Sequence, residues 1–269
     1  AALVFLPGCG GEAAALVAVA MGASLGAWLV GSDRQQRVLY QAAQLRRAIA
    51  TGRHREIETQ LRKQLALAEA GEAVSPERQW VARAQLGGLL VAEWRLDEAR
   101  AIYGADSERL NPHLQHLANY GRHELALLEG TPDQSTLDAI LGDRDACLAY
   151  VPSRYRETVA RAWRALEGLA LARMGRAADA VPALEESLPS LDFNPARVIY
   201  LYHLAQAQEQ LGLRDAASKH YLEAAQAFPG TRLASEAKAR QLALGAGGAP
   251  DGLFRGMLPE APAVSGGLP

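Results

Sequence analysis

The stretch IYLYHLAQAQEQLGLRDAASKHYLEAAQAFP, residues 199–229, decides the fold of this chain. Apolar and small residues fill a first helical stretch, and small residues and one ring recur at fixed intervals in a second. A glycine makes the turn between the two stretches, and a proline ends the second helix. These roles fall to Leu204, Ala205, Gly212, Ala217, Tyr221, Ala224 and Pro229.

The segment before this hairpin repeats the pattern with a shift of 37 residues, and a fixed period is the sign of a repeat architecture. The matching residues are Gly168, Gly175, Ala180 and Leu184. Ser187 replaces the third small residue, and the closing proline comes late, at Pro195. We therefore expect a second hairpin with a slightly long connection after it.

A third match runs from Trp80 to Tyr103. Gly87 and Ala99 take the first two small positions, and Tyr103 takes the ring position. Trp94 stands where the pattern has glycine, which makes this turn the least typical of the three.

Two looser helix pairs and a final helix complete the predicted domain. The pairs comprise residues 38–50 with 54–70, broken at Thr51-Gly52, and residues 111–129 with 135–141, broken at Gly130-Thr131-Pro132. Residues 233–244 read as a capping helix with a polar side. We predict one helical domain over residues 32–244, because a single hairpin cannot bury its apolar face alone.

This spacing resembles the tetratricopeptide repeat over roughly residues 38–229. The resemblance implies an all-α, short right-handed solenoid of antiparallel hairpins whose first helices line a groove for partner proteins. Carried over position by position, that groove would present Leu169, Arg173, Tyr202, Gln206 and Glu209. The Phe228-Pro229-Gly230-Thr231 ending is similar to endings in bacterial envelope repeat proteins.

Composition agrees with a helical protein. Apolar residues make up 49% and aromatic residues only 6%, so alanine and leucine, both strong helix formers, supply most of the core. The formal net charge of −2 gives no indication of a nucleic-acid partner.

The N-terminal region contains eighteen consecutive uncharged residues, 13–30, preceded by the segment 1–12. As a helix they would extend about 27 Å, close to the hydrocarbon thickness of a bilayer. We predict one transmembrane helix over residues 13–31, with a buried core helix or an uncleaved signal-like segment as the alternatives. Small residues recur every fourth position and predict a face for packing against another membrane helix, formed by Ala14, Ala18, Gly22 and Gly26.

The sequence leaves open on which side of the membrane the helical domain lies. Arg34, Arg37, Arg46 and Arg47 follow the helix and place the domain in the cytoplasm by the positive-inside rule. A charged leader missing before Ala1 would reverse that assignment and place it in the periplasm. The sequence Leu6-Pro7-Gly8-Cys9 also resembles a lipoprotein cleavage box, although Pro7 fits it poorly. We expect a single-pass protein of a bacterial inner membrane.

Catalytic motifs are weak. Residues 22–26 match Gly-x-Ser-x-Gly, but they lie in the predicted membrane helix, where a nucleophile elbow cannot form. His113 and His116 could share a metal, whereas His123 is about 10 Å further along the helix and no acidic ligand supports the pair. Cys147 reads as a small buried residue. We predict no cofactor, no metal, no small-molecule substrate and no enzymatic activity.

Residues 245–269 contain seven glycines and four prolines, which is linker composition. An apolar cluster inside this tail predicts a docking segment, with an unimportant tail as the alternative. Its residues are Leu253, Phe254, Met257 and Leu258.

These features predict a membrane-anchored adaptor that binds other proteins and organises a multiprotein complex. The alternatives are a bacterial envelope chaperone or assembly factor, and an accessory subunit held permanently in a membrane complex.

Overall fold

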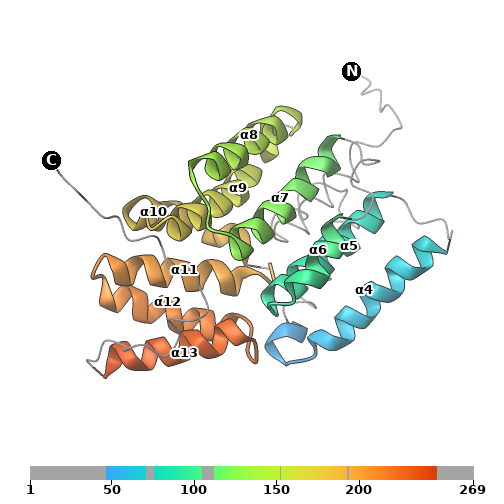
Figure 1. The fold of residues 1–269 in the computed structure, drawn as a ribbon. Coiled ribbons are helices and arrows are strands. Elements are labelled where there is room, and N and C mark those ends of the chain that lie inside the picture. Colours follow the sequence, from blue (N-terminus) through green and yellow to red (C-terminus); the bar gives the residue numbers. More distant parts are fainter. Residues whose placement is uncertain (1–46, 71–75, 105–111, 152, 193, 247–269) are drawn as a thin grey trace, which may run out of the picture.

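A computed structural model describes residues 47–70, 76–104, 112–151, 153–192 and 194–246 (Figure 1). These parts of the chain are entirely helical apart from turns and connections. Residues 47–50 end a helix that precedes α4. The remaining elements are α4 (His54–Glu69), α5 (Pro76–Ala92), α6 (Leu96–Gly104), α7 (Pro112–Glu129), α8 (Gln134–Tyr150), α9 (Ser153–Arg173), α10 (Ala177–Ser187), the 3-10 helix η2 (Leu188–Leu191), α11 (Arg197–Gln210), α12 (Arg214–Ala227) and α13 (Arg232–Gly245).

The predicted membrane helix, residues 13–31, lies outside the described residues, as do the segment 1–12 and the tail from residue 247 onward. None of the helices in the described ranges is long and apolar enough to cross a bilayer.

Consecutive helices pack in pairs, as the repeat spacing predicts. α5 packs on α6, α7 on α8, α9 on α10 and α11 on α12. Gly175 and Gly212 lie at the bends of the last two pairs with φ of 75° each, a backbone conformation that favours glycine. At both bends the amide after the glycine bonds the carbonyl five residues earlier, which satisfies the open end of the first helix.

The same turn recurs at Gly52 and, without glycine, at Trp94. Trp94 adopts φ of 64°, and Arg95 N donates to Leu90 O at 2.8 Å as the equivalent amides do elsewhere. The ring of Trp94 is partly buried against the core, and the Arg232 guanidinium lies 5.7 Å from its centroid. These contacts hold a left-handed tryptophan in a turn where the sequence alone favours glycine.

The second helix of the α7–α8 pair extends further than the sequence pattern indicates. α8 continues past Leu141 through Gly142 to Tyr150. Asp133 caps it by accepting from Thr136 N at 2.9 Å, with the Thr136 side chain bonding back to Asp133 N. Ile140 and Cys147 are buried on one face, so packing maintains the helix across the exposed Gly142.

Small residues allow the close helix contacts. A Cβ placed on Gly168 would lie 2.7 Å from Leu184 Cγ, across the α9–α10 pair. The Tyr103 ring is held between two glycines, because a Cβ on Gly87 or on Gly121 would lie within 2.5 Å of it. Tyr103 therefore joins α5, α6 and α7.

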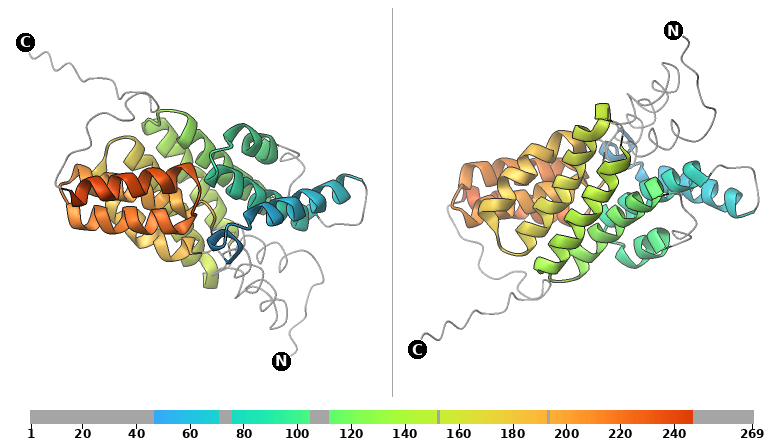
Figure 2. Two further views of the ribbon diagram at one scale, coloured as in Figure 1. Left: turned by 90° about the horizontal axis from the view of Figure 1, so that it is seen from below. Right: turned by 90° about the horizontal axis from the view of Figure 1, so that it is seen from above.

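The first helices of the four pairs, α5, α7, α9 and α11, form a closed cycle. Each contacts the next, and α11 also contacts α5. Figure 2 shows the described helices from two further sides. In an open solenoid each unit contacts only its neighbours. Here Tyr120 of α7, Trp163 of α9 and Tyr200 of α11 are buried between these helices.

The first and last described hairpins also meet. The ring of His54, at the start of α4, makes an edge contact with Phe228, whose centroid is 5.1 Å away. Phe228 ends α12 and is fully buried. The stack of pairs is thus compact, and its two ends share a contact.

Candidate partner-binding surface

Two of the three groove residues predicted on α11, Tyr202 and Glu209, bond to the helices that follow. Tyr202 donates to Glu236 of α13, and Gln206 Nε2 donates to the Tyr202 hydroxyl at 3.3 Å. Glu209 accepts from the Tyr221 hydroxyl at 2.8 Å and pairs with Arg240 at 3.5 Å. Tyr202 is only 2% exposed, whereas Gln206 and Glu209 are half-buried.

The two groove residues predicted on α9 differ from each other. Leu169 has no exposed surface. Arg173 is half-buried and donates to Gly130 O at 2.7 Å, so it covers the C-terminal end of α7. Burial lowers the pKa of Arg173, and no described carboxylate lies within ion-pair distance of it.

A partner could therefore reach Leu169 and Tyr202 only if neighbouring helices moved. Arg173, Gln206 and Glu209 keep part of their surface accessible. The binding role of all five stays a prediction.

The space between the first helices contains a buried polar chain. The Tyr120 and Tyr200 hydroxyls are 3.0 Å apart, and Tyr200 donates to Glu124 at 2.6 Å. Burial is the main cause that raises the pKa of Glu124 to about 7, and the hydrogen bond from Tyr200 opposes it. The hydrogen bond from Tyr200 therefore joins α7 to α11. Separating the two helices would leave the buried Glu124 carboxyl without a partner, which costs more free energy than the hydrogen bond itself contributes.

A second polar cluster forms around Asp143 of α8. It accepts from Asn119 Nδ2 at 2.9 Å and lies 2.8 Å from His123 Nε2, while His116 Nδ1 is 4.0 Å away. Sequence reasoning found no acidic partner for these histidines because it considered only their own helix. Among the described residues no group of histidine, cysteine, aspartate and glutamate has the arrangement to hold a metal ion.

Cys147 follows Asp143 by one helical turn and is buried, as its sequence context predicts. Burial raises the pKa of its thiol to about 11. A thiol of this kind stays protonated and is a poor nucleophile at neutral pH.

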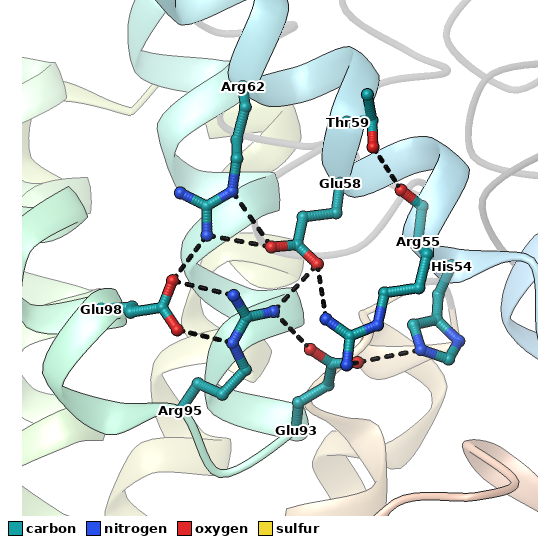
Figure 3. Close-up of polar contacts among 8 residues, drawn as sticks. All are labelled: His54, Arg55, Glu58, Thr59, Arg62, Glu93, Arg95 and Glu98. Carbon is teal, nitrogen blue, oxygen red and sulfur yellow. Dashed lines mark hydrogen bonds and ion pairs between the residues drawn. The ribbon is translucent and has the colours of Figure 1, made fainter.

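The largest ion-pair network joins α4 to the turn between α5 and α6 (Figure 3). It alternates acidic and basic side chains from His54, Arg55, Glu58, Arg62, Glu93, Arg95 and Glu98. Glu58 is at its centre and is bonded by three guanidinium groups, those of Arg55, Arg62 and Arg95.

The three arginines of this network are matched by its three glutamates, and their ion pairs hold α4 against the turn between α5 and α6. Hydrogen bonding from Arg95 is the largest cause that lowers the pKa of Glu58 to about 2. Arg95 is the residue after Trp94, so the left-handed turn directs it toward Glu58. Each of these seven side chains has at least one ion-pair partner within the network.

Three exposed leucines lie on the last described helices and turns, at separate positions. Leu211 and Leu213 flank the Gly212 turn, and Leu242 lies near the end of α13. Their exposed fractions are 43%, 48% and 60%. Tyr150 and Leu222 are the other large apolar residues exposed in the described part of the chain.

Two groups of predicted site residues lie outside the described residues. They are the membrane-helix packing residues Ala18, Gly22 and Gly26, and the tail residues Leu253, Phe254, Met257 and Leu258. Both stay predictions.

The fold and these sites define an all-α domain of helices packed in consecutive pairs, an arrangement consistent with a helical repeat. Comparison of the chain with protein families, with curated proteins and with solved structures finds no match.

Proposed function

We propose that this chain is a membrane-anchored adaptor of the tetratricopeptide-like class, which holds partner proteins together and does no chemistry itself. The observation that carries the proposal is the recurrence of one turn at Gly52, Trp94, Gly175 and Gly212. The same hydrogen-bond pattern at each turn supports a repeated structural unit, and stacked units of this kind present extended surfaces suited to protein recognition.

The proposed binding surface centres on Arg173, Gln206 and Glu209. These are the predicted groove residues that keep part of their surface accessible, and Arg173 carries a charge that no described carboxylate balances. Arginine is enriched in binding hot spots, where a partner carboxylate could pair with it in two hydrogen bonds. A partner with an acidic segment is the chemistry that fits this surface.

The anchor is proposed from residues 13–30 alone. Confinement to a membrane raises the local concentration of a weak binder near its target. Ala18, Gly22 and Gly26 would add a contact with a partner's membrane helix.

The test is recovery of the tagged full chain from its native membrane in mild detergent, with partners identified and counted by mass spectrometry. We expect a small partner set at fixed stoichiometry. Arg173→Gln combined with Gln206→Ala should lower its yield about tenfold, the effect of one hot-spot residue.

The control pairs Arg156→Gln with Gln226→Ala, on exposed positions of α9 and α12. It should leave the yield unchanged. Equal yields from both double variants would contradict the proposed surface. A variable mixture of unfolded clients would contradict the adaptor function itself and favour a chaperone.

A further inference from the structure

Helices from the two ends of the described chain meet along one boundary. His54 of α4 contacts Phe228 at the end of α12, and the Arg232 guanidinium of α13 lies 5.7 Å from the centroid of the Trp94 ring. In the interior, α11 contacts α5. We call the boundary between helices α4–α7 and helices α11–α13 the seam, and Figure 1 shows α11–α13 beside α4–α6.

A chain of hydroxyl and carboxyl groups crosses the seam between α7 and α11. Tyr200 of α11 donates to Glu124 of α7 at 2.6 Å, and its hydroxyl lies 3.0 Å from the hydroxyl of Tyr120. All three side chains are buried. The polar contacts across the seam therefore depend on a carboxyl group that is closed off from solvent.

The titratable groups that surround Glu124 are tyrosines. Tyr103 of α6, Tyr120 of α7 and Tyr200 of α11 each interact electrostatically with its carboxyl group. The adjacent helix α9 contributes the Trp163 ring, 5.4 Å from that of Tyr120. Burial raises the pKa of Glu124 to about 7 against the hydrogen bond from Tyr200, and no described cation contributes to this pKa. Once ionised, the carboxylate thus has no positive charge among the described residues to compensate it.

We propose that the proton on Glu124 holds the seam shut, and that its loss lets α11–α13 move away from α4–α7. While the carboxyl group is neutral, the bond from Tyr200 satisfies it inside the seam. An ionised carboxylate without a cation is unfavourable in the interior and favourable in water, which reaches it when the seam opens. Helix α9 contacts both α7 and α11, so it keeps the two groups of helices connected. This inference is independent of the proposed function, since it concerns only how one chain opens.

The direction of the pH dependence follows from proton linkage. The pKa of Glu124 is about 7 in the closed seam and returns toward its ordinary value of 4.5 when water reaches the carboxyl group. The closed seam is therefore favoured fully below pH 4.5, and this advantage is lost as the pH rises through about 7. The equilibrium constant for opening should rise about a hundredfold between pH 4.5 and 8.

The test measures labelling of a cysteine placed at the seam, because a thiol reagent detects brief openings of a folded protein. Leu204 has no exposed surface and follows Tyr200 by four residues, so both lie on the same face of α11. Leu204→Cys is made in the full chain with Cys9→Ser and Cys147→Ala, and is labelled with a pyridyl disulfide. Each rate is divided by that of the urea-unfolded chain at the same pH. We expect this normalised rate to rise about a hundredfold between pH 4.5 and 8.

Two variants assign the rise to the polar chain. Glu124→Gln keeps a hydrogen-bond acceptor but does not titrate, so it should make the labelling of Leu204→Cys independent of pH. Tyr200→Phe removes the hydroxyl that bonds Glu124, so it should speed labelling even at pH 4.5. Should Leu204→Cys fail to fold, Ala207→Cys is the second reporter, since Ala207 is also buried on α11.

A control reporter separates opening of the seam from unfolding of the whole domain. Leu184 is fully buried too, but it packs against Gly168 within the α9–α10 pair. Leu184→Cys should be labelled at least about tenfold more slowly than Leu204→Cys at pH 8, because exposing it requires the pair itself to unfold.

Three results would overturn the proposal. The first is a normalised rate for Leu204→Cys that stays level from pH 4.5 to 8. The second is equal labelling of Leu204→Cys and Leu184→Cys, which would assign the exposure to global unfolding. The third is a rise with pH that persists in Glu124→Gln, which would assign the opening to another titratable group.

Discussion

At the scale of single residues, backbone conformation decides where each hairpin bends. Gly212 has φ of 75°, and a Cβ built on it meets nothing within 4 Å, so a side chain there would cost backbone strain alone. Trp94 tolerates the same conformation because its ring gains packing against the core. The sequence therefore predicts the glycine turns well and leaves the tryptophan turn in doubt.

Replacing Gly212 and Gly142 by alanine should change stability in opposite directions. Gly212→Ala should lower the free energy of unfolding by about 1 kcal/mol through left-handed strain. Gly142 lies in the middle of α8, is exposed to solvent and also has open space around it. Gly142→Ala should therefore raise the free energy of unfolding by about 0.5 to 1 kcal/mol. Urea unfolding measures both, and a loss in both variants would contradict this account.

At the scale of elements, glycines set how closely helices approach. Gly87 and Gly88 are neighbours on α5 with different surroundings. A Cβ on Gly87 would lie 2.4 Å from Tyr103 Cζ, whereas one on Gly88 would make an ordinary contact 3.7 Å from Asn194 Oδ1. Tyr103 cannot yield because Gly121 of α7 lies against it too.

Gly87→Ala should therefore destabilise the domain by about 1 to 3 kcal/mol, and Gly88→Ala should be neutral or stabilising. Both changes remove the same unfavourable helix propensity of glycine. The difference between their free energies of unfolding therefore measures how tightly Tyr103 packs against Gly87. Adding Tyr103→Leu to Gly87→Ala should cost less than the sum of the two single changes. Simple additivity in thermal unfolding would show that the ring does not limit the approach of the helices.

The sequence predicts most elements and few of the contacts between them. The turns at Gly52, Gly175 and Gly212 follow from glycine placement, while the full length of α8 depends on the burial of Ile140 and Cys147. The Asp143 cluster and the Glu58 network join side chains from different helices. Their partners are set by how hairpins pack, which a local pattern does not contain.

At the scale of the whole molecule, the closed cycle of first helices departs from what the repeat resemblance implies. Contact between α11 and α5 brings distant units together, and the hydrogen bond from Tyr200 to Glu124 joins residues 76 apart in sequence. Such a contact could not be predicted from a pattern in which each unit touches only its neighbours.

The Glu124 contact should make stability depend on pH. Its pKa is raised from 4.5 to about 7, so the folded state holds a proton that the unfolded state releases between these values. The stabilising contribution is complete below pH 4.5 and is lost as the pH rises through about 7. Relative to Glu124→Gln, the wild-type chain should lose roughly 3 kcal/mol between these limits in urea unfolding. Parallel pH profiles would contradict the assignment.

The contact between the first and last described hairpins should couple their protection against hydrogen exchange. Phe228→Ala removes a fully buried ring that touches His54, at a cost of about 3 to 5 kcal/mol. Hydrogen exchange should rise in α4 as well as in α12 and α13. Leu137→Ala, a buried change in α8, should instead act first on α7 and α9. Unchanged exchange in α4 after Phe228→Ala would show that the ends unfold independently.

The meeting of His54 with Phe228 also constrains how the protein is made. A ribosome adds roughly 5 to 20 residues per second, and about 170 residues separate the two rings. This contact can form only about 10 to 30 s after His54 is synthesised, whereas α5, which packs on α4, follows it directly in the chain. The contact that joins the first and last described hairpins should therefore be among the last to form during synthesis, after the neighbouring helices have already packed.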